Sequence, residues 1–284
     1  MKKNNVLFQL LSCLIFSLLG LQIKFLSISN SIETIVFFRC FLGAFFMIFF
    51  SMILKKKIKK IFFNKYIKIH LIRAIFGIVA MYCGYKALSI ISLSLASTIG
   101  FTKVFFTSLL ATIILKESVN YKNILLIVFG FFGIYLIALP SAAPQLDGLV
   151  FGLTSALFVS GGIISVSYLT KKDNTVNILM FHSVISSFLV FLIFYKGISF
   201  DISDNFFYLI LMTLTALLGQ YFNTESYRNE KANIIIVVSY SRIIFSTVLG
   251  FLILDEKIDL VSLLGIMIII FTTFFVKKYS VNNN

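Results

Sequence analysis

Apolar residues run along the chain in long stretches separated by short polar breaks, almost continuously from Val6 to Val276. An α-helix needs about 20 mostly apolar residues, at about 1.5 Å of rise each, to cross the hydrocarbon of a bilayer. The pattern therefore predicts ten membrane-spanning helices, at residues 5–25, 33–54, 66–89, 92–115, 122–140, 147–169, 175–197, 205–226, 232–254 and 258–276.

The polar breaks are short, and they leave no room for a linker or a soluble domain. They read SISNS at 27–31, PSAAPQLD at 140–147, KKDNT at 171–175 and ISDN at 202–205. The start of the chain is charged like a signal peptide, but its apolar run is too long and lacks a small-residue cleavage pattern. We expect it to be the first retained span.

The distribution of Lys and Arg predicts how the spans are oriented. Seventeen of the 25 lie in one set of alternate loops, whereas the other set holds only Lys196 and Lys257. Positive residues are retained on the cytoplasmic side of short loops. We therefore expect a multi-pass protein of the cytoplasmic (inner) membrane with both termini in the cytoplasm. The KKKIKK run at 55–60 fits this rule, and docking to anionic lipid is its alternative explanation.

Composition supports a membrane protein and excludes other classes. The chain is 59% hydrophobic, with a mean hydropathy of +1.01, against roughly 45–50% apolar residues in soluble domains. The formal charge of +14 is spread over short loops, so it does not indicate a nucleic-acid-binding domain. Cys13, Cys40 and Cys83 lack metal-ligand spacing, and we expect neither a metal nor a cofactor. No cluster of His, Asp, Glu or Ser indicates an enzyme.

Two segments of the chain resemble each other, which indicates an internal duplication. Residues 85–117 align with 227–256 once a three-residue gap is allowed near the loop. In the ungapped part an offset of 139 places Lys103 opposite Arg242, Lys116 opposite Asp255, and Glu117 opposite Glu256. With five spans in each half, 1–140 and 147–276, the second copy enters the membrane in the opposite sense. The expected fold class is all-α, a polytopic membrane protein of ten helices in a 5+5 inverted repeat. Such repeats support alternating access.

The chain also resembles a known family, the EamA-like carriers of the drug/metabolite transporter superfamily. The resemblance rests on FFRCFLGAFF at 37–46, LIRAIFGIVAMYCGYKAL at 71–88, ALSIISLSLAS at 87–97 and the helix end LKE at 115–117. It implies a ten-helix carrier whose cavity is lined by helices three, four, eight and nine. FFR and the spacing from LIR to the tyrosine are also similar to S-adenosylmethionine uptake transporters.

Ionisable residues inside the predicted spans are the candidates for chemistry, because each costs roughly 2.5–3.5 kcal/mol to insert at mid-membrane. Lys24 lies near a span end, where we expect it to reach the interface. The candidate substrate-binding residues are Arg39, Arg73, Tyr85, Lys86, Lys103, Tyr240 and Arg242. The alternative for each base is a structural hydrogen bond to backbone carbonyls, and the alternative for each tyrosine is packing. Acidic partners are scarce, so we expect a substrate with an anionic group.

The expected function is a secondary carrier that moves a small metabolite, such as an amino acid or a derivative like S-adenosylmethionine, across the cytoplasmic membrane. An exporter or flippase of a phosphorylated or lipid-linked substrate is the alternative. Only Glu225 and His182 are candidates for proton coupling, which favours exchange or facilitated transport. The expected partners are the substrate and the bilayer, with a homodimer left open.

Overall fold

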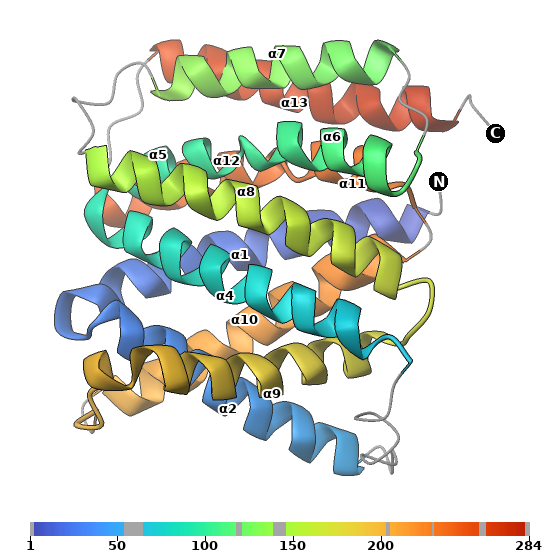
Figure 1. Ribbon diagram of the computed structural model, residues 1–284. Coiled ribbons are helices and arrows are strands. Elements are labelled where there is room, and N and C mark those ends of the chain that lie inside the picture. The colour runs from blue at the N-terminus through green and yellow to red at the C-terminus, as the bar shows by residue number, and fades with distance from the viewer. Residues whose placement is uncertain are drawn as a thin grey trace.

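The computed structural model describes residues 3–53, 65–117, 121–138, 146–202, 205–228, 230–255 and 260–281. Within these ranges every secondary-structure element is a helix and none is a strand (Figure 1). The helices are α1 (Lys3–Ser29), α2 (Ile32–Ile53), α4 (Ile67–Ile90), α5 (Leu93–Gly100), α6 (Lys103–Ile114), α7 (Tyr121–Ala138), α8 (Leu146–Leu169), α9 (Thr175–Phe194), the 3₁₀ turn η1 (Tyr195–Gly197), α10 (Phe206–Ser226), α11 (Ala232–Val238), α12 (Ser241–Leu254) and α13 (Leu260–Val281).

The described helices coincide with the predicted spans to within a few residues, with two exceptions. The predicted spans 92–115 and 232–254 are each divided, into α5 and α6 and into α11 and α12. Eight segments of the described chain are long and apolar enough to cross a membrane. α7 and α13 contain apolar stretches that are shorter than this, 124–133 and 263–272. The chain is therefore a polytopic helical membrane protein, and the count of ten crossings stays a prediction.

The helices pack in layers with their axes roughly parallel to one another (Figure 1). α4 lies against α8, α1 against α10, and α2 against α9. α7 and α13 lie side by side as an outer layer, at the top of Figure 1. The start of α1 and the end of α13 lie at the same end of the bundle.

Large apolar side chains are exposed along the outer faces of the helices. Examples are Phe45, Phe129, Phe188, Leu252 and Ile113. A monomer in water rarely exposes apolar side chains so extensively. In a bilayer this surface meets hydrocarbon, so it costs nothing to leave it uncovered.

Two adjacent glycines of α8 show how closely α4 and α8 approach. A Cβ built on Gly161 would lie 2.4 Å from the Cδ2 atom of the Phe76 ring on α4, whereas one built on Gly162 would meet nothing within 4 Å. Only Gly161 is thus required by the contact, while Gly162 faces the interior space described below.

A carboxylate of the first half caps a helix of the second half. Glu117 follows α6, and its Oε1 and Oε2 accept hydrogen bonds from the backbone N–H groups of Ala232 and Asn233, at 2.9 and 3.2 Å. These are the first residues of α11, whose N–H groups have no partner within the helix. The chain turns into this position through Lys116, which adopts a left-handed conformation with φ of 53°. Glu117 therefore ties the two halves together.

The contact at Gly161 predicts unequal effects of one methyl group at neighbouring positions. We expect Gly161→Ala to lower the free energy of unfolding by about 1–3 kcal/mol relative to Gly162→Ala, because only the first substitution overpacks the interface with Phe76. Thermal unfolding of the two variants in the same detergent measures the difference. Equal melting temperatures would contradict the contact.

The cap by Glu117 predicts a loss of stability when its charge is removed. We expect Glu117→Gln to lower the free energy of unfolding by about 1–2 kcal/mol. The amide has one acceptor oxygen for two N–H groups, and it carries no negative charge to interact favourably with the helix dipole. Asp201→Asn, at an exposed loop position, is the matched control and should unfold like the wild type. Indistinguishable unfolding of the two variants would show that the cap contributes nothing.

Candidate functional site

Two helices are interrupted midway, at corresponding places in the two halves. Between α5 and α6 the backbone N–H groups of Phe101 and Thr102 bond to carbonyls three residues earlier, Thr98 and Ile99. Between α11 and α12, Tyr240 and Arg242 do the same with Val237 and Ser239. Such short stretches of tighter winding inside a helix often mark functional hinges.

Side-chain hydroxyls accompany both interruptions. Thr102 donates its hydroxyl proton to the carbonyl of Ile99 at 2.9 Å, and Ser239 donates to that of Ile236 at 2.5 Å. These bonds give partners to carbonyls where the regular helical hydrogen bonding is lost. Inside a membrane every backbone polar group needs such a partner. A base lies in the first turn of the helix that follows each interruption, Lys103 in α6 and Arg242 in α12.

An internal cavity of about 270 Å³ lies between the helices. Its charged and polar lining residues are Gln9, Cys13, Arg39, Arg73, Tyr85, Ser97, Lys103, Ser155, His182, Gln220, Asn223, Ser239 and Arg242. The resemblance implied a lining from helices three, four, eight and nine, which correspond to α4, α5–α6, α10 and α11–α12. All of these contribute, and α1, α2, α8 and α9 line the cavity as well.

The structure brings five of the seven candidate binding residues to this one cavity: Arg39, Arg73, Tyr85, Lys103 and Arg242. They come from α2, α4, α6 and α12, so they are far apart in the sequence. Arg73 and Tyr85 are buried, and the other three are partly buried, as expected of side chains that border an internal space. Lys86 is the neighbour of Tyr85 on α4, but it is not among the lining residues.

Tyr240 lies outside the cavity lining and packs against α7. Its side chain is fully buried, and its hydroxyl donates to the carbonyl of Ile127 at 3.3 Å. The ring lies so close to Gly130 that a Cβ there would come within 2.5 Å of it. A Tyr at the interruption before α12 is therefore used for packing, which is the alternative that the sequence left open for each tyrosine.

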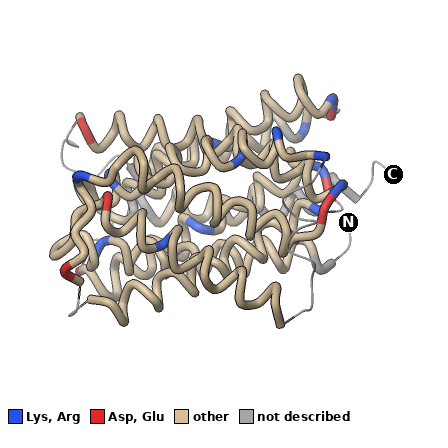
Figure 2. The backbone as a smooth tube through the Cα atoms, turned by 60° about the horizontal axis from the view of Figure 1, so that its bottom comes forward, with Lys and Arg blue, Asp and Glu red and all other residues tan. Residues whose placement is uncertain are grey.

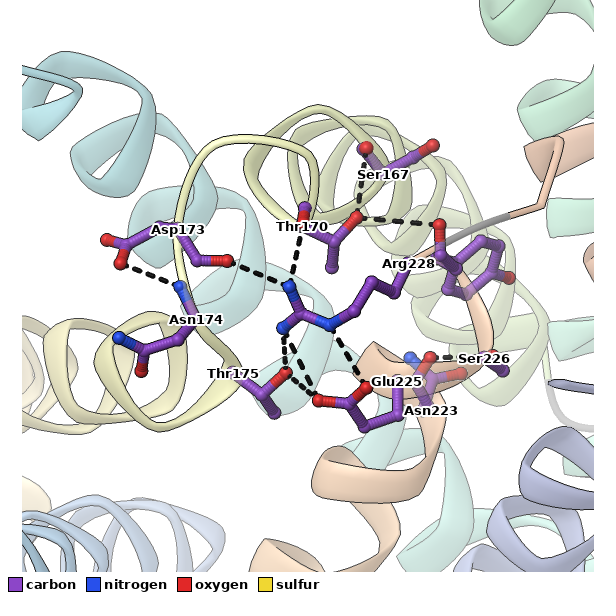
Figure 3. A network of polar contacts seen from close by, with 10 residues as sticks. Ser167, Thr170, Asp173, Asn174, Thr175, Asn223, Glu225, Ser226 and Arg228 are labelled. Carbon is purple, nitrogen blue, oxygen red and sulfur yellow. Dashed lines mark hydrogen bonds and ion pairs between the residues drawn. The ribbon is translucent and has the colours of Figure 1, made fainter. Parts of the chain in front are cut away.

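Glu225 also lies away from the cavity, in a polar network at one end of the bundle (Figure 3). Arg228 donates from Nε to Glu225 Oε2 at 3.0 Å and from Nη1 to the carbonyl of Thr170 at 2.9 Å. Glu225 accepts a further hydrogen bond from the hydroxyl of Thr175. The carboxylate is thus held by an ion pair at the end of α10. The hydrogen bonds to Thr170 and from Thr175 join this end to the connection between α8 and α9.

The same connection is tied to the start of α4 by a second buried pair. His70 Nε2 lies 3.3 Å from Asp173 Oδ2, and the imidazole stacks on the Phe181 ring at 4.3 Å. Burial acts to raise the pKa of Asp173, but the neighbouring His70 and the hydrogen bonds that Asn177 and Asn174 donate to the carboxylate outweigh burial and hold this pKa below its ordinary value. A charged Asp173 therefore helps to close this end of the bundle.

His182, the other candidate for coupling, does line the cavity. It is buried on α9, and its Nδ1 lies 3.3 Å from the hydroxyl of Ser186. Its imidazole also sits directly against Gly77 of α4, where a Cβ would come within 2.4 Å of Cε1. A larger residue at Gly77 would displace the ring from this position.

Sequence reasoning missed the amide and serine side chains of the lining. The amides Gln9, Gln220 and Asn223 lie inside apolar helices, and Ser226 donates to Gln9 Oε1 at 2.7 Å. An amide within a predicted span is the signal that could have found them, because it costs free energy wherever it faces lipid. Ser155 offers no such signal, and its hydroxyl donates across the helix contact to the carbonyl of Ala80 at 2.7 Å.

Charge is distributed unequally between the cavity and the ends of the bundle. Figure 2 shows Asp and Glu towards the two ends of the helices, whereas several Lys and Arg lie along the middle. Among the described residues, no Asp or Glu lines the cavity, while four bases do. The interior space therefore carries a positive potential, which a surrounding of low dielectric constant screens poorly.

Comparison with known proteins gives one consistent result. The EamA-like transporter family matches the chain over residues 4–139 and 146–277. The pseudopaline exporter CntI of Pseudomonas aeruginosa is 24% identical over 270 residues, 94% of this chain and 94% of the exporter. An uncharacterized transporter of Helicobacter pylori is 28% identical over 206 residues, 70% of this chain and 69% of that protein.

A solved crystal structure shares the fold, with a TM-score of 0.74 and 13% identity over 96% of both chains. The family match is the decisive one, because its two segments together span nearly the whole described chain. This chain therefore belongs to the EamA-like transporter family.

Proposed function

We propose that the protein is a secondary carrier for a small metabolite that bears an anionic group. The observation that carries this proposal is the central cavity, which four bases line and no described carboxylate neutralises. Buried charges are normally paired, because an unpaired one is costly in a medium of low dielectric constant. An anionic substrate would supply the missing partner each time that it binds.

Transport by alternating access is proposed from the relation between the two halves. α4 lies against α8 as α10 lies against α1, and α6 lies against α8 as α12 lies against α1. The two left-handed residues outside glycine in the described chain, Lys116 and Asp255, share a φ of 53° and are separated by the predicted offset. These observations support an inverted repeat of five helices each, which can exchange two packings of similar energy.

The cavity volume favours a small substrate. About 270 Å³ lies just below the range of about 300–1,000 Å³ that is common for ligand pockets. Amino acids and their derivatives fit this size, and a lipid-linked substrate fits it less well. S-Adenosylmethionine stays a candidate, but its ammonium and sulfonium groups would meet four bases, so compounds with net negative charge rank above it.

The direction of transport is proposed as export, because one relative that matches 94% of this chain is named an exporter. For coupling we propose exchange or facilitated transport. Of the two candidate coupling residues, Glu225 is engaged by Arg228 outside the cavity, and His182 alone borders it.

Transport by reconstituted protein tests the proposal. Proteoliposomes would be given a labelled panel of amino acids, S-adenosylmethionine and phosphorylated sugars, with and without the unlabelled compound inside. We expect saturable, counter-substrate-stimulated uptake of at least one carboxylate-bearing compound, lowered about tenfold or more in Lys103→Gln and in Arg242→Gln, since each removes a charge-assisted contact.

Lys196→Gln is the control, because it makes the same chemical change at an exposed position of η1. It should transport like the wild type. Uptake that is unaffected in the Lys103 and Arg242 variants, although they fold, would assign these bases to structure and overturn the proposal.

We also propose that the protein lies in the cytoplasmic membrane with both termini in the cytoplasm, as the charge asymmetry predicts. The test places single cysteines at Lys172 and Lys196 in a protein whose Cys13, Cys40 and Cys83 are replaced by serine. A membrane-impermeant maleimide added to intact cells should label residue 196 and not residue 172. The reverse pattern would invert the proposed orientation.

A further inference from the structure

The four cavity bases fall into two like-charged pairs from different parts of the bundle. Arg39 of α2 and Arg73 of α4 form the first pair, because both line the cavity near His182. Arg39 borders a small pocket together with that imidazole, and Arg73 lies about one helical turn from Gly77, which packs against the same ring. Lys103 of α6 and Arg242 of α12 form the second pair, because each follows one of the two helix interruptions and both line the cavity. Like charges held together inside a membrane repel each other, so each pair is costly unless an anion lies between its members.

Among the described residues, the hydrogen-bond and ring partners of these bases are neutral groups. Arg39 Nη1 donates to the sulfur of Met81, a weak acceptor. Arg242 Nη2 donates to the carbonyl of Phe16 at 3.2 Å, and Lys103 Nζ lies 4.6 Å from the centroid of the Phe101 ring. The Nε atoms of Arg39, Arg73 and Arg242 are buried and have no hydrogen-bond partner. Each pair thus has at least one buried N–H donor that a ligand could engage.

Tyr85 borders the cavity beside Arg39 of the first pair. The guanidinium carbon of Arg39 lies 5.8 Å from the centroid of the Tyr85 ring, and Tyr85 also interacts electrostatically with Arg242 of the second pair. Its side chain is buried and borders the cavity, and its hydroxyl has no hydrogen-bond partner. A ligand that reaches from one pair to the other would pass this hydroxyl.

We propose that the cavity binds a substrate with two separated anionic groups, one held by Arg39 and Arg73 and the other by Lys103 and Arg242. This inference rests on the proposed function and narrows its substrate class to compounds of at least two carboxylates. Arginine can hold a carboxylate through two parallel hydrogen bonds and lysine acts as a point charge. Tyr85 hydrogen-bonds the part of the substrate between the two groups.

Ligand-induced stabilisation of the purified protein tests the inference directly. The probes are succinate, glutarate and adipate, each compared with its half-amide, in which one carboxylate is replaced by a neutral amide of the same size. We expect the dicarboxylate of best-matching length to bind about ten- to hundredfold more tightly than its half-amide, because the second charge gains charge-assisted hydrogen bonds. The concentration for half-maximal shift in melting temperature gives the affinities.

Two double variants assign the pairs. Arg39→Gln with Arg73→Gln, and separately Lys103→Gln with Arg242→Gln, should each bind the dicarboxylate no more tightly than its half-amide. Lys196→Gln combined with Lys172→Gln, both at exposed positions, should keep the preference. If a double variant does not fold, the comparison of dicarboxylate with half-amide on the wild type still decides the question.

The outcomes separate this inference from the proposed function. The two-anion site would be overturned if the wild type bound dicarboxylates and half-amides equally tightly. If both kinds of compound also inhibited transport of the labelled substrate, the proposal of an anion carrier would still hold. Binding of neither series, together with transport of a neutral or cationic compound, would overturn both. A dicarboxylate preference that survives the loss of one pair would also overturn the assignment.

Discussion

Backbone hydrogen bonding inside a bilayer is the constraint on which the other features of this molecule depend. Without water, every N–H and C=O group must find a partner in the protein, so the spanning segments are helices almost throughout their described length. The same constraint makes an interruption costly. The two that occur, before Lys103 and Arg242, are tolerated where tighter winding and hydroxyl groups engage backbone carbonyls beside an internal cavity. Irregular backbone at this depth is therefore a marker of the site.

Much of the fold could be predicted from the sequence, because a segment that crosses a bilayer must be a long apolar helix. Apolar stretches gave the helix positions to within a few residues, and Arg39, Arg73, Lys103 and Arg242 stood out because charge is costly in hydrocarbon. The interruptions of the spans at 92–115 and 232–254 could not be predicted, since Gly, Ser and Thr occur throughout these spans without breaking them.

Other parts of the site depend on contacts between distant helices, which one sequence does not reveal. Tyr85 and Tyr240 looked equivalent in the sequence, but Tyr85 faces the cavity and Tyr240 packs against Gly130. Glu225 looked like a carboxylate free to change charge, until the structure placed it beside Arg228 from the same helix end. In the sequence Glu117 stands out as a repeat position and as part of the helix end LKE, whereas its role as a cap depends on α11 being close by.

The cap at Glu117 has a consequence for biosynthesis. A chain is made from its N-terminus, so the carboxylate that accepts from Ala232 and Asn233 is present at the end of α6 before its two donors have been synthesised. When the second half is inserted into the bilayer, the carboxylate that caps α11 is therefore already present. A gene split between the halves would lose this order, and the earlier product would wait with an exposed acid until its partner arrived.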